Sequence, residues 1–415
     1  MKVLFITSAY PTHCDDARGI FIHRLARELC RQGIHVTVIA PGAPSAMSSE
    51  TMDDVEVYRT KYWVQRWQHL ATDLSGIVPA IKQRPWLLLQ VPSLIASLTW
   101  SAVRHASSFD IIHAHWLYPA GIAGVIAAKL RKLPIVVTSH GGDLNLAHHS
   151  TALAFISKRI SRASNVCIGV SKALCEQFCS YGVPKDRSVY IPVGAEVADQ
   201  SPFPAVSGCE ELHEFAAFAG LRILYVGSLI PRKSVDTILS AHHKLNVLGY
   251  PVASALVGSG PEKDRLKLMV KNLMINNVYM VDEQPPSLIR FWMAAAHTLV
   301  LPSLSEGQPT VAMEAMTLGL PVVATDIPGT RELVQPGKTG FLFLPRDVEQ
   351  LAECLENLIK DESLRQQMGR RAKEFIAARG LTTPQITREH IALYERLLGL
   401  KATHSAHRTT VYELR

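Results

Sequence analysis

The fold of this 415-residue chain is decided by the stretch Ser305-Glu306-Gly307-Gln308-Pro309-Thr310-Val311-Ala312-Met313-Glu314-Ala315-Met316. Its two glutamates, Glu306 and Glu314, follow the apolar, strand-like run 298–303, and helix-forming residues continue to the end of the stretch. The pattern predicts that Glu306 lies on a loop at the carboxyl end of a strand, with Glu314 about one to two turns into the next helix. Because open α/β sheets bind ligands at that edge, the stretch predicts both an α/β fold and a ligand site.

Short β-branched runs alternate with helical patterns on both sides of this stretch. In the N-terminal half, strands are predicted at 2–9, 35–40, 111–116, 135–140, 165–170 and 189–193, with helices between them. In the C-terminal half, they are predicted at 222–227, 253–257, 278–281, 298–301, 321–324 and 340–344. The alternation predicts two Rossmann-like, doubly wound parallel sheets that face each other across a cleft.

The length of the chain predicts two domains, and its composition, 47% hydrophobic and 19% charged, excludes a disordered protein. We expect an N-terminal domain at 1–196 and a linker at 197–220, where the pattern breaks into Ser, Pro, Gly and acidic residues. A C-terminal domain is expected at 221–383. The helix predicted at 384–402 is expected to pack back on the N-terminal domain, and 403–415 is expected to be a tail.

Several classes of protein and site are disfavoured by the sequence. We find no apolar run of the ~18 residues that a membrane-spanning helix needs, and the apolar start is too short for a signal peptide. Seven irregularly spaced cysteines favour buried thiols in a reducing, cytoplasmic compartment. No metal site is predicted: Cys175 and Cys179 lack a second ligand pair, and His113 and His115 lack a third ligand.

The positive charge is confined to one half of the chain. Residues 1–196 hold 20 Lys+Arg against 13 Asp+Glu, whereas residues 197–415 hold 23 of each. The excess predicts an anionic partner for the N-terminal half, either a membrane surface or a phosphorylated substrate, and no motif supports nucleic acid. Between 59 and 109 lie six Lys+Arg, one acidic residue and four tryptophans. These residues favour peripheral attachment to the inner face of a membrane, and the alternative is that the tryptophans pack in the core.

The stretch 305–316, together with Gly319-Leu320-Pro321-Val322-Val323-Ala324-Thr325, resembles the carboxylate signature of retaining glycosyltransferases of family 4. The resemblance covers nearly the whole chain and is weakest at 45–105 and 195–220. It implies the two-Rossmann-domain GT-B fold, in which the C-terminal domain binds the nucleotide sugar and the N-terminal domain faces the acceptor. It also implies that neither a metal nor a cofactor is needed, with the nucleoside diphosphate sugar as co-substrate.

The segment 226–234 resembles the family's strand-loop-helix that carries an Arg and a Lys to the donor phosphates. Lys233 matches the position of the Lys. Ser228 occupies the usual position of the Arg, and the neighbouring Arg232 is a candidate substitute for it. Fixed cations at this place stabilise the charge that the leaving nucleoside diphosphate gains.

The resemblance also assigns roles to the glutamates. Glu306 matches the residue that anchors hydroxyls of the donor sugar, and Glu314 matches the one that accepts hydrogen bonds from the ribose hydroxyls. Backbone contacts to the donor are implied for Gly19, Gly258, Gly307, Thr310 and Val311.

On the N-terminal side, His140-Gly141-Gly142-Asp143 follows a predicted strand and resembles the family's His-Gly-(Ser)-Asp loop. The resemblance places His140 beside the transferred sugar as a catalytic residue, and Asp143 beside the sugar or the acceptor. Arg18, which precedes Gly19, is either a phosphate contact or a surface side chain, and the sequence leaves both readings open.

The sequence therefore favours a metal-independent, retaining glycosyltransferase that moves a hexose from a nucleoside diphosphate sugar to a hydroxyl acceptor. A UDP-sugar is the first choice of donor and GDP-mannose the second. The acceptor is expected to be a glycan or lipid-linked glycan of envelope polysaccharide or glycolipid synthesis. The alternatives are a catalytically inactive binding or scaffold protein with the same fold, and a glycoside hydrolase that uses a carboxylate pair.

Overall fold

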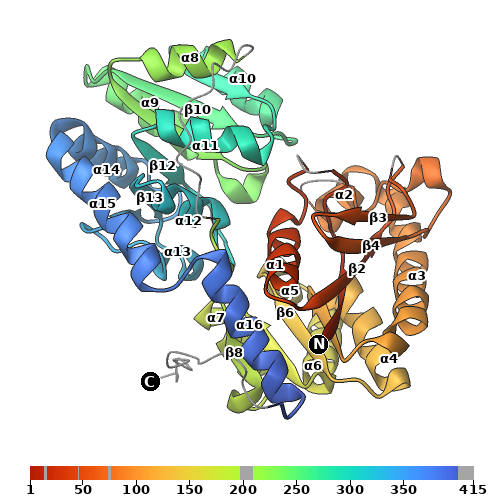
Figure 1. Ribbon diagram of the computed structural model, residues 1–415. Coiled ribbons are helices and arrows are strands. Elements are labelled where there is room, and N and C mark those ends of the chain that lie inside the picture. Colours follow the sequence, from red (N-terminus) through yellow and green to blue (C-terminus); the bar gives the residue numbers. More distant parts are fainter. Residues whose placement is uncertain (14–15, 45, 73–75, 197–208, 401–415) are drawn as a thin grey trace. The chain divides into compact units, whose positions relative to one another are not determined.

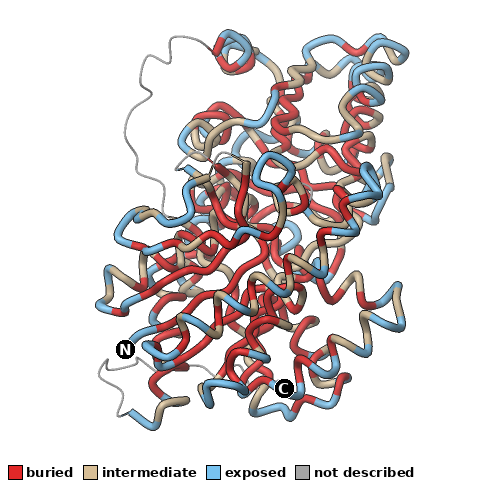
Figure 2. Tube along the Cα trace, turned by 90° about the vertical axis from the view of Figure 1, so that its right-hand side faces the viewer, coloured by how far each residue is buried: buried red, intermediate tan, exposed pale blue. Residues whose placement is uncertain are grey.

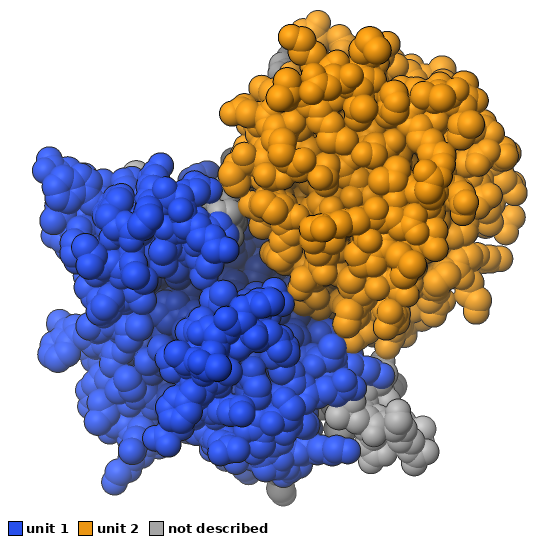
Figure 3. Space-filling view, turned by 180° about the vertical axis from the view of Figure 1, so that it is seen from behind, with its two compact units in different colours: residues 1–194, 383–415 blue, residues 195–382 orange. Residues whose placement is uncertain are grey.

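A computed structural model describes residues 1–13, 16–44, 46–72, 76–196 and 209–400. The chain forms two compact α/β units, coloured separately in Figure 3: residues 1–194 with 383–415, and residues 195–382. Each unit is built around one predominantly parallel sheet, as predicted (Figure 1). The strands run through the buried parts of each unit, drawn red in Figure 2, since parallel sheets are covered by helices on both faces.

The sheet of the first unit has eight strands in the order β3-β4-β2-β1-β5-β6-β7-β8. Neighbouring strands are parallel except for β3, which pairs antiparallel with β4 at one edge. The strands are β1 (Lys2–Thr7), β2 (His35–Pro41), β3 (Ser49–Met52), β4 (Val55–Thr60), β5 (Ile111–His115), β6 (Ile135–Ser139), β7 (Val166–Gly169) and β8 (Ser188–Tyr190).

Helices cover both faces of this sheet. They are α1 (Ile20–Arg31), α2 (Ile77–Gln83), α3 (Gln90–His105), α4 (Ile122–Arg131), α5 (Gly142–His148), α6 (Thr151–Ala163), α7 (Lys172–Ser180) and α16 (Thr383–Leu397), with a short 3₁₀ turn η2 (Pro85–Leu89) leading into α3. Leu4 and Ile6 share a hydrophobic core with Leu94 of α3 and Ala123 of α4. Because side chains alternate along a strand, Phe5 points to the opposite face, which α1 and α16 cover.

The second unit has six parallel strands in the order β11-β10-β9-β12-β13-β14. The strands are β9 (Leu221–Val226), β10 (Val252–Val257), β11 (Val278–Val281), β12 (Thr298–Leu301), β13 (Val322–Thr325) and β14 (Gly340–Phe343). The helices are α8 (Glu210–Ala217), α9 (Asp236–Val247), α10 (Lys263–Asn272), α11 (Pro286–Ala295), α12 (Thr310–Thr317), α13 (Pro328–Arg331), α14 (Val348–Lys360) and α15 (Glu362–Ala378), and the 3₁₀ turn η6 (Pro231–Lys233) precedes α9.

In both sheets the strand order reverses beside the first strand of the unit. β1 lies between β2 and β5, and β9 lies between β10 and β12. The loops after two adjacent strands therefore diverge to opposite faces and leave room at the carboxyl edge between them. In the second unit these are the loops that carry Lys233 and Glu306.

Two expectations about local structure were wrong, and two strands were missed. The region 197–220 is not entirely a linker, because α8 begins at Glu210 and buries Leu212 and Phe215; residues 197–208 lie outside the described residues. The edge strand β3 and its neighbour β4 were not predicted, because polar and acidic residues interrupt their apolar pattern. The predicted end of the C-terminal helix at 402 also lies beyond α16, and residues 401–415 are not described.

A fourth correction concerns hydropathy. Among the described residues, the helical stretch Pro85–Ser108 is long and apolar enough to cross a membrane by length and composition, with a mean hydropathy of 1.4 in its most apolar window. No such stretch was expected, because Ser, Thr and Gln interrupt its apolar residues without adding charge. Its inner side chains Leu94, Leu98 and Ala102 lie in the core of the first unit, as a helix of a folded domain requires.

The C-terminal helix α16 packs against α1 and reaches the sheet through one hydrogen bond. The Tyr394 hydroxyl and Nδ1 of His113 on β5 lie 2.6 Å apart, and Nε2 of His113 lies 2.7 Å from Oγ1 of Thr138 on β6. All three residues are buried. The imidazole thus links α16 to two neighbouring strands, so the last helix is tied into the centre of the first unit.

We expect Tyr394→Phe to loosen this link, because it leaves Nδ1 of the buried His113 without its partner. The local free energy of opening of α16 and β5 should fall by about 1–3 kcal/mol, measured by amide hydrogen exchange. Tyr250→Phe is the matched control, since its hydroxyl bonds Glu356 in a partly exposed position. Equal exchange in both variants would show that the His113 bond contributes nothing.

Candidate active site

The second unit brings two loops together at its switch point. After β9 the chain passes through η6, and Ser234 takes a left-handed conformation (φ 47°) that ends this turn before α9. After β12, the N–H of Leu304 donates to the backbone oxygen of Arg232 at 2.8 Å. The Arg232 guanidinium in turn donates to the backbone oxygen of Ser305 at 2.7 Å. These bonds hold the Arg232–Lys233 pair against the loop that carries Glu306.

The Lys233 ammonium forms an ion pair with Oε1 of Glu306, and Nη1 of Arg232 lies 4.0 Å from Oε2. The Glu306 side chain is 9% exposed, Lys233 is 19% exposed and Arg232 is 41% exposed. Burial alone would raise the pKa of the Glu306 carboxyl, but the charges of Lys233 and Arg232 lower its pKa below the usual value. The site therefore holds an ionised carboxylate beside two cations, one of which remains open to solvent.

Gly258 is required by a close approach between two loops. It has φ 150°, and a Cβ at this position would lie 2.0 Å from the backbone oxygen of Gly227, so any side chain would push the β9 and β10 loops apart. The structure therefore gives Gly258 a packing role at the edge of the site. Its predicted contact with the donor stays a prediction.

The other predicted donor residues lie where α12 begins. Thr310 and Val311 form its first turn after Pro309, and this N-cap residue makes no side-chain cap hydrogen bond. The N–H groups of the first turn point toward the carboxyl edge of the sheet, as they do at any helix N-terminus. Glu314 lies one turn into α12 and is half-buried between the buried Met313 and Ala315. The placement of Glu306 on the loop and Glu314 in the helix agrees with the expectation from their spacing.

In the first unit, Asp143 anchors the loop that follows β6. Its carboxylate accepts hydrogen bonds from Ser139 Oγ at 2.6 Å, from the N–H of Leu117 at 2.8 Å and from the N–H of Leu144 at 3.0 Å. Burial raises the pKa of Asp143, although these hydrogen bonds act to lower it. Since the carboxylate joins the loops after β5 and β6 inside the unit, it fixes the position of His140, and its role on the acceptor side stays a prediction.

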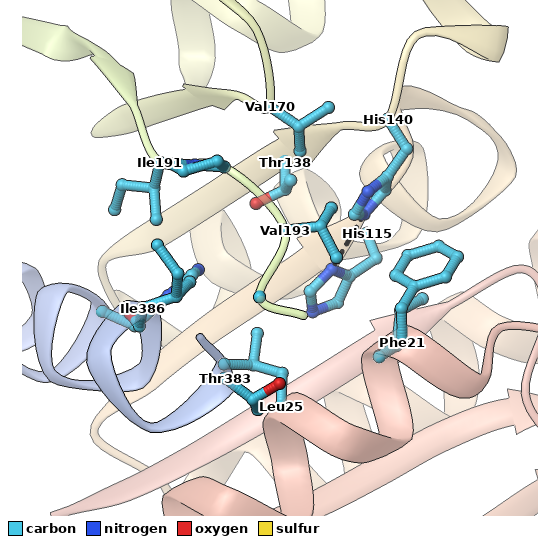
Figure 4. A pocket seen from close by; sticks show the side chains of 14 residues that line it. Phe21, Leu25, His115, Thr138, His140, Val170, Ile191, Val193, Thr383 and Ile386 are labelled. Atoms are coloured by element: carbon cyan, nitrogen blue, oxygen red, sulfur yellow. Dashed lines mark hydrogen bonds between the residues drawn. The ribbon is translucent and has the colours of Figure 1, made fainter. Parts of the chain in front are cut away.

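His140 lies in a small pocket of the first unit (Figure 4). The pocket lies between α1, the ends of β5 and β6, the segment 191–194 and the start of α16. His115 and His140 both line it, with Nδ1 of His115 3.2 Å from Nε2 of His140. Phe21 from α1 packs against the His140 ring, with 4.8 Å between the ring centroids.

The two rings are neutral under physiological conditions. Burial lowers the pKa of His140 to about 3, with a smaller effect from His390, and burial lowers the pKa of His115 well below its usual value. One ring therefore donates a hydrogen bond to the other, and the second nitrogen of each ring takes no part in this bond. These two nitrogens, Nε2 of His115 and Nδ1 of His140, are buried with no hydrogen-bond partner among the described residues. Because neutral imidazole has one N–H, the pair always offers one donor and one acceptor.

Gly19 and Arg18 have structural partners within the first unit. Gly19 precedes α1 with φ 62°, and a Cβ there would lie 2.4 Å from the backbone oxygen of Ala9. Arg18 is neither a surface side chain nor a free cation: it is 14% exposed, forms an ion pair with Asp16 at 2.5 Å and donates to the backbone oxygen of Thr72 at 3.1 Å. The contact expected between Gly19 and the donor stays a prediction.

The structure thus brings Arg232, Lys233 and Glu306 together in the second unit, with Gly307, Thr310 and Val311 on the same loop and helix start. In the first unit it places His140 beside a residue to which sequence reasoning gave no role, His115. The signal was present, because His113 and His115 alternate with Ala114 on one strand face. The spacing of two histidines on one strand face is typical of a metal site as well as of a hydrogen-bonded pair. The described residues contain no cluster of His, Cys, Asp or Glu suited to a metal.

Comparison with known proteins identifies the family. The profile of the family "Glycosyl transferases group 1" matches residues 219–375, and that of "Glycosyltransferase Family 4" matches residues 19–199. A protein of Bacillus subtilis (strain 168) assigned to teichuronic acid biosynthesis, the glycosyltransferase TuaC, is 31% identical over 369 residues, which cover 86% of this chain and 88% of TuaC. The N-acetyl-alpha-D-glucosaminyl L-malate synthase of Bacillus anthracis is 24% identical over 91% of this chain and 92% of the synthase.

Solved structures share the fold. Sucrose-phosphate synthase from Thermosynechococcus elongatus superposes with a TM-score of 0.77 at 20% identity, covering 96% of this chain and all of that one. Anabaena HepE, solved in complex with UDP-glucose, gives a TM-score of 0.73 at 19% identity, covering 95% of this chain and all of HepE. The two-sheet architecture is therefore the GT-B fold. With both family profiles matching most of its length, the chain belongs to the group 1 and family 4 glycosyltransferases and is a glycosyltransferase.

Proposed function

We propose that this glycosyltransferase moves a hexose from a nucleoside diphosphate sugar to a hydroxyl acceptor, with retention of anomeric configuration and without a metal. The observation that carries the proposal is the ion pair of Lys233 and Glu306, with Arg232 beside it, at the switch point of the second unit. Such a donor has an anionic phosphate joined directly to a sugar that bears hydroxyls. One ligand can therefore give the cations an anion and the carboxylate a hydroxyl donor.

In this reaction the protein mainly positions the two substrates and stabilises the charge of the leaving group. The acceptor oxygen bonds to the anomeric carbon as the bond from that carbon to the β-phosphate oxygen breaks, and the departing oxygen takes the acceptor proton. Lys233 and Arg232 stabilise the charge that the nucleoside diphosphate gains, and the open start of α12 adds N–H groups. Glu306 holds the sugar hydroxyls through an ionised carboxylate and does not act as a nucleophile. Glu314 accepts hydrogen bonds from the ribose hydroxyls of the nucleotide.

The first unit supplies the acceptor side. The pair of His115 and His140 offers one donor and one acceptor, which matches a hydroxyl group because a hydroxyl can donate one hydrogen bond and accept another. Neutral rings suit an uncharged sugar hydroxyl better than a phosphate. We assign His140 to the transferred sugar, with Asp143 fixing the loop that carries it.

A UDP-sugar is the proposed donor, with GDP-mannose as the second choice, and HepE, which shares the fold, has been solved with UDP-glucose. The proposed acceptor is a glycan or lipid-linked glycan of envelope polysaccharide synthesis. TuaC is assigned to teichuronic acid biosynthesis, and the Escherichia coli (strain K12) relative WcaL, 26% identical over 63% of this chain, to colanic acid biosynthesis. A thermal-shift panel of UDP, GDP, ADP and TDP tests the base, since only a bound nucleotide raises the melting temperature.

We expect Lys233→Ala and Glu314→Ala each to lower turnover of a defined donor by roughly 10²–10³, the scale of one lost preorganised contact. Lys244→Ala is the control, since this lysine of α9 is also ion-paired, with Glu349, away from the switch point. Melting temperatures must accompany the rates, because removing Lys233 leaves a buried carboxylate unpaired. Full activity in both folded variants would refute the donor site.

His140→Ala should abolish transfer while leaving nucleotide affinity, measured by calorimetry, nearly unchanged, because most of the proposed nucleotide contacts belong to the second unit. His148→Ala is the matched control, an exposed histidine at the end of α5, eight residues further along the chain. If His140→Ala loses nucleotide affinity as well as transfer, His140 has a structural role.

Transfer should continue at an unchanged rate in the presence of EDTA, since side-chain cations and helix N–H groups carry the phosphate charge in this proposal. Dialysed enzyme with and without added Mg²⁺ or Mn²⁺ provides the comparison. A strict requirement for either ion would overturn the metal-independent mechanism while leaving the donor residues open to the mutational test.

A further inference from the structure

The outer surface of the helical stretch 85–104 is apolar although it faces solvent. Its exposed positions follow one another at helical spacings of three or four, from Leu88 and Leu89 through Pro92, Ala96 and Trp100 to Arg104. Leu89 is 71% exposed and Trp100 is 72% exposed. A surface helix of a folded domain normally presents charged and polar residues on this side. Here the only charge on the stripe is Arg104, at its end.

The neighbouring helix α4 extends this surface. α3 and α4 lie side by side in Figure 1, and Nε of Arg131 in α4 donates to the backbone oxygen of Val103 in α3 at 2.8 Å. α4 exposes Leu130 (64%) and Ile126. We call the whole surface the α3–α4 face; it consists of the apolar residues Trp86, Leu88, Leu89, Trp100, Ile126 and Leu130 with the exposed cations Lys82, Arg84, Arg104, Lys129, Arg131 and Lys132.

The charge around this face has one sign. Residues 57–142 contain nine Lys+Arg and only two acidic residues, an excess of seven that equals the formal net charge of the entire chain, +7. Of the two acidic residues, Asp110 accepts a hydrogen bond from the backbone N–H of Lys2, and Asp73 lies outside the described residues. In the part of the chain that the structure describes, no acidic side chain therefore belongs to the α3–α4 face.

Tryptophan is distributed in the same way. Trp292 is fully buried, and Trp63 and Trp116 are half-buried, whereas Trp67, Trp86 and Trp100 are exposed. Trp67 lies near the start of α3, because its backbone oxygen accepts from Nε2 of Gln90 at 2.8 Å. The Arg66 guanidinium lies 4.6 Å from its ring centroid. Exposed aromatic rings beside cations are suited to the boundary between lipid headgroups and acyl chains.

We propose that the α3–α4 face docks on an anionic lipid surface, with its leucines and tryptophans at the headgroup boundary and its cations on the lipid phosphates. The stretch 85–108 lies along this surface and does not cross the bilayer, because its inner side chains belong to the core. A second copy of the chain fits less well, since pairing this face with itself would oppose like charges. The inference concerns where the enzyme works and goes beyond the proposed reaction.

Docking at this face leaves the candidate residues of the first unit uncovered. The core beneath α3 and α4 contains Leu4, Ile6 and Ala114, whereas Phe5, His113 and His115 point to the opposite face of the sheet. Substitutions on the α3–α4 face should therefore change lipid binding without changing turnover of a water-soluble acceptor.

The test is sedimentation of the full chain with vesicles of phosphatidylcholine alone or with 30% phosphatidylglycerol, at low and high salt. We expect binding only to the anionic vesicles and loss of most binding at high salt. Lys82→Gln/Arg84→Gln/Lys129→Gln should weaken binding about 100-fold, at about fivefold for each cation removed. Leu89→Ser/Trp100→Ser should weaken it at least about tenfold, through lost apolar contact.

The controls are matched in number and residue type. Lys338→Gln/Arg370→Gln/Lys373→Gln removes three exposed cations of the second unit, and Phe155→Ser/Leu268→Ser removes an exposed aromatic and an exposed leucine elsewhere. Both should bind like the unaltered protein. Binding lost equally in the controls, or no binding to anionic vesicles at low salt, would overturn the proposal. So would sedimentation velocity showing a dimer that Leu89→Ser/Trp100→Ser dissociates, because the face would then be occupied by a second copy.

Discussion

The ion pair between Lys233 and Glu306 joins the two loops that leave the second sheet at its switch point. Its members lie 73 residues apart, and the backbone bonds between the same loops, from Leu304 to Arg232 and from Arg232 to Ser305, hold the pair in place. Removing one member of a buried pair costs several kcal/mol, because the other charge is left without a partner. A ligand that takes the ammonium must therefore also satisfy the carboxylate. A molecule with an anion next to hydroxyl groups does both, and the need to satisfy both charges restricts the ligand chemistry more than either residue does alone.

The pocket of the first unit differs from this site in its electrostatics. It contains imidazoles in place of fixed charges, and burial lowers the pKa of His115, His140 and His390 so that all three stay neutral near pH 7. A pocket without net charge does not attract a phosphate, but its unpaired ring nitrogens can recognise a hydroxyl. Asp143 makes this arrangement rigid because its carboxylate uses its hydrogen-bonding capacity inside the loop. Charge is thus concentrated where a leaving group would need it and is absent where a neutral acceptor would bind.

Much of the fold could be predicted because buried parallel strands are continuous apolar runs, and a loop residue such as Lys233 can be assigned by its position after one of them. Contacts between side chains were harder to predict from the sequence. From the sequence, Arg18 could be a phosphate contact or a surface residue, because the sequence does not show that its side chain forms an ion pair with Asp16. It also could not predict that His115 would meet His140, because that depends on the register of β5 and β6. The strand β4 was missed because its outward side chains are polar and interrupt the apolar pattern.

The burial of the tryptophans also could not be predicted from the sequence. The cations near them are arranged differently from the cations of the second unit. Sequence spacing could not tell core from surface for Trp63 and Trp100, and the structure buries part of the first and exposes most of the second. The second unit has no excess charge in its half of the sequence, yet hydrogen bonds and an ion pair fix the positions of Arg232 and Lys233 at the proposed donor site. The cations of the α3–α4 face are spread over exposed side chains of α2, α3, α4 and the residues that flank them, an arrangement that does not define a small anion site. Dispersed charge of this kind suits an extended anionic surface, whose many headgroups need no single geometry.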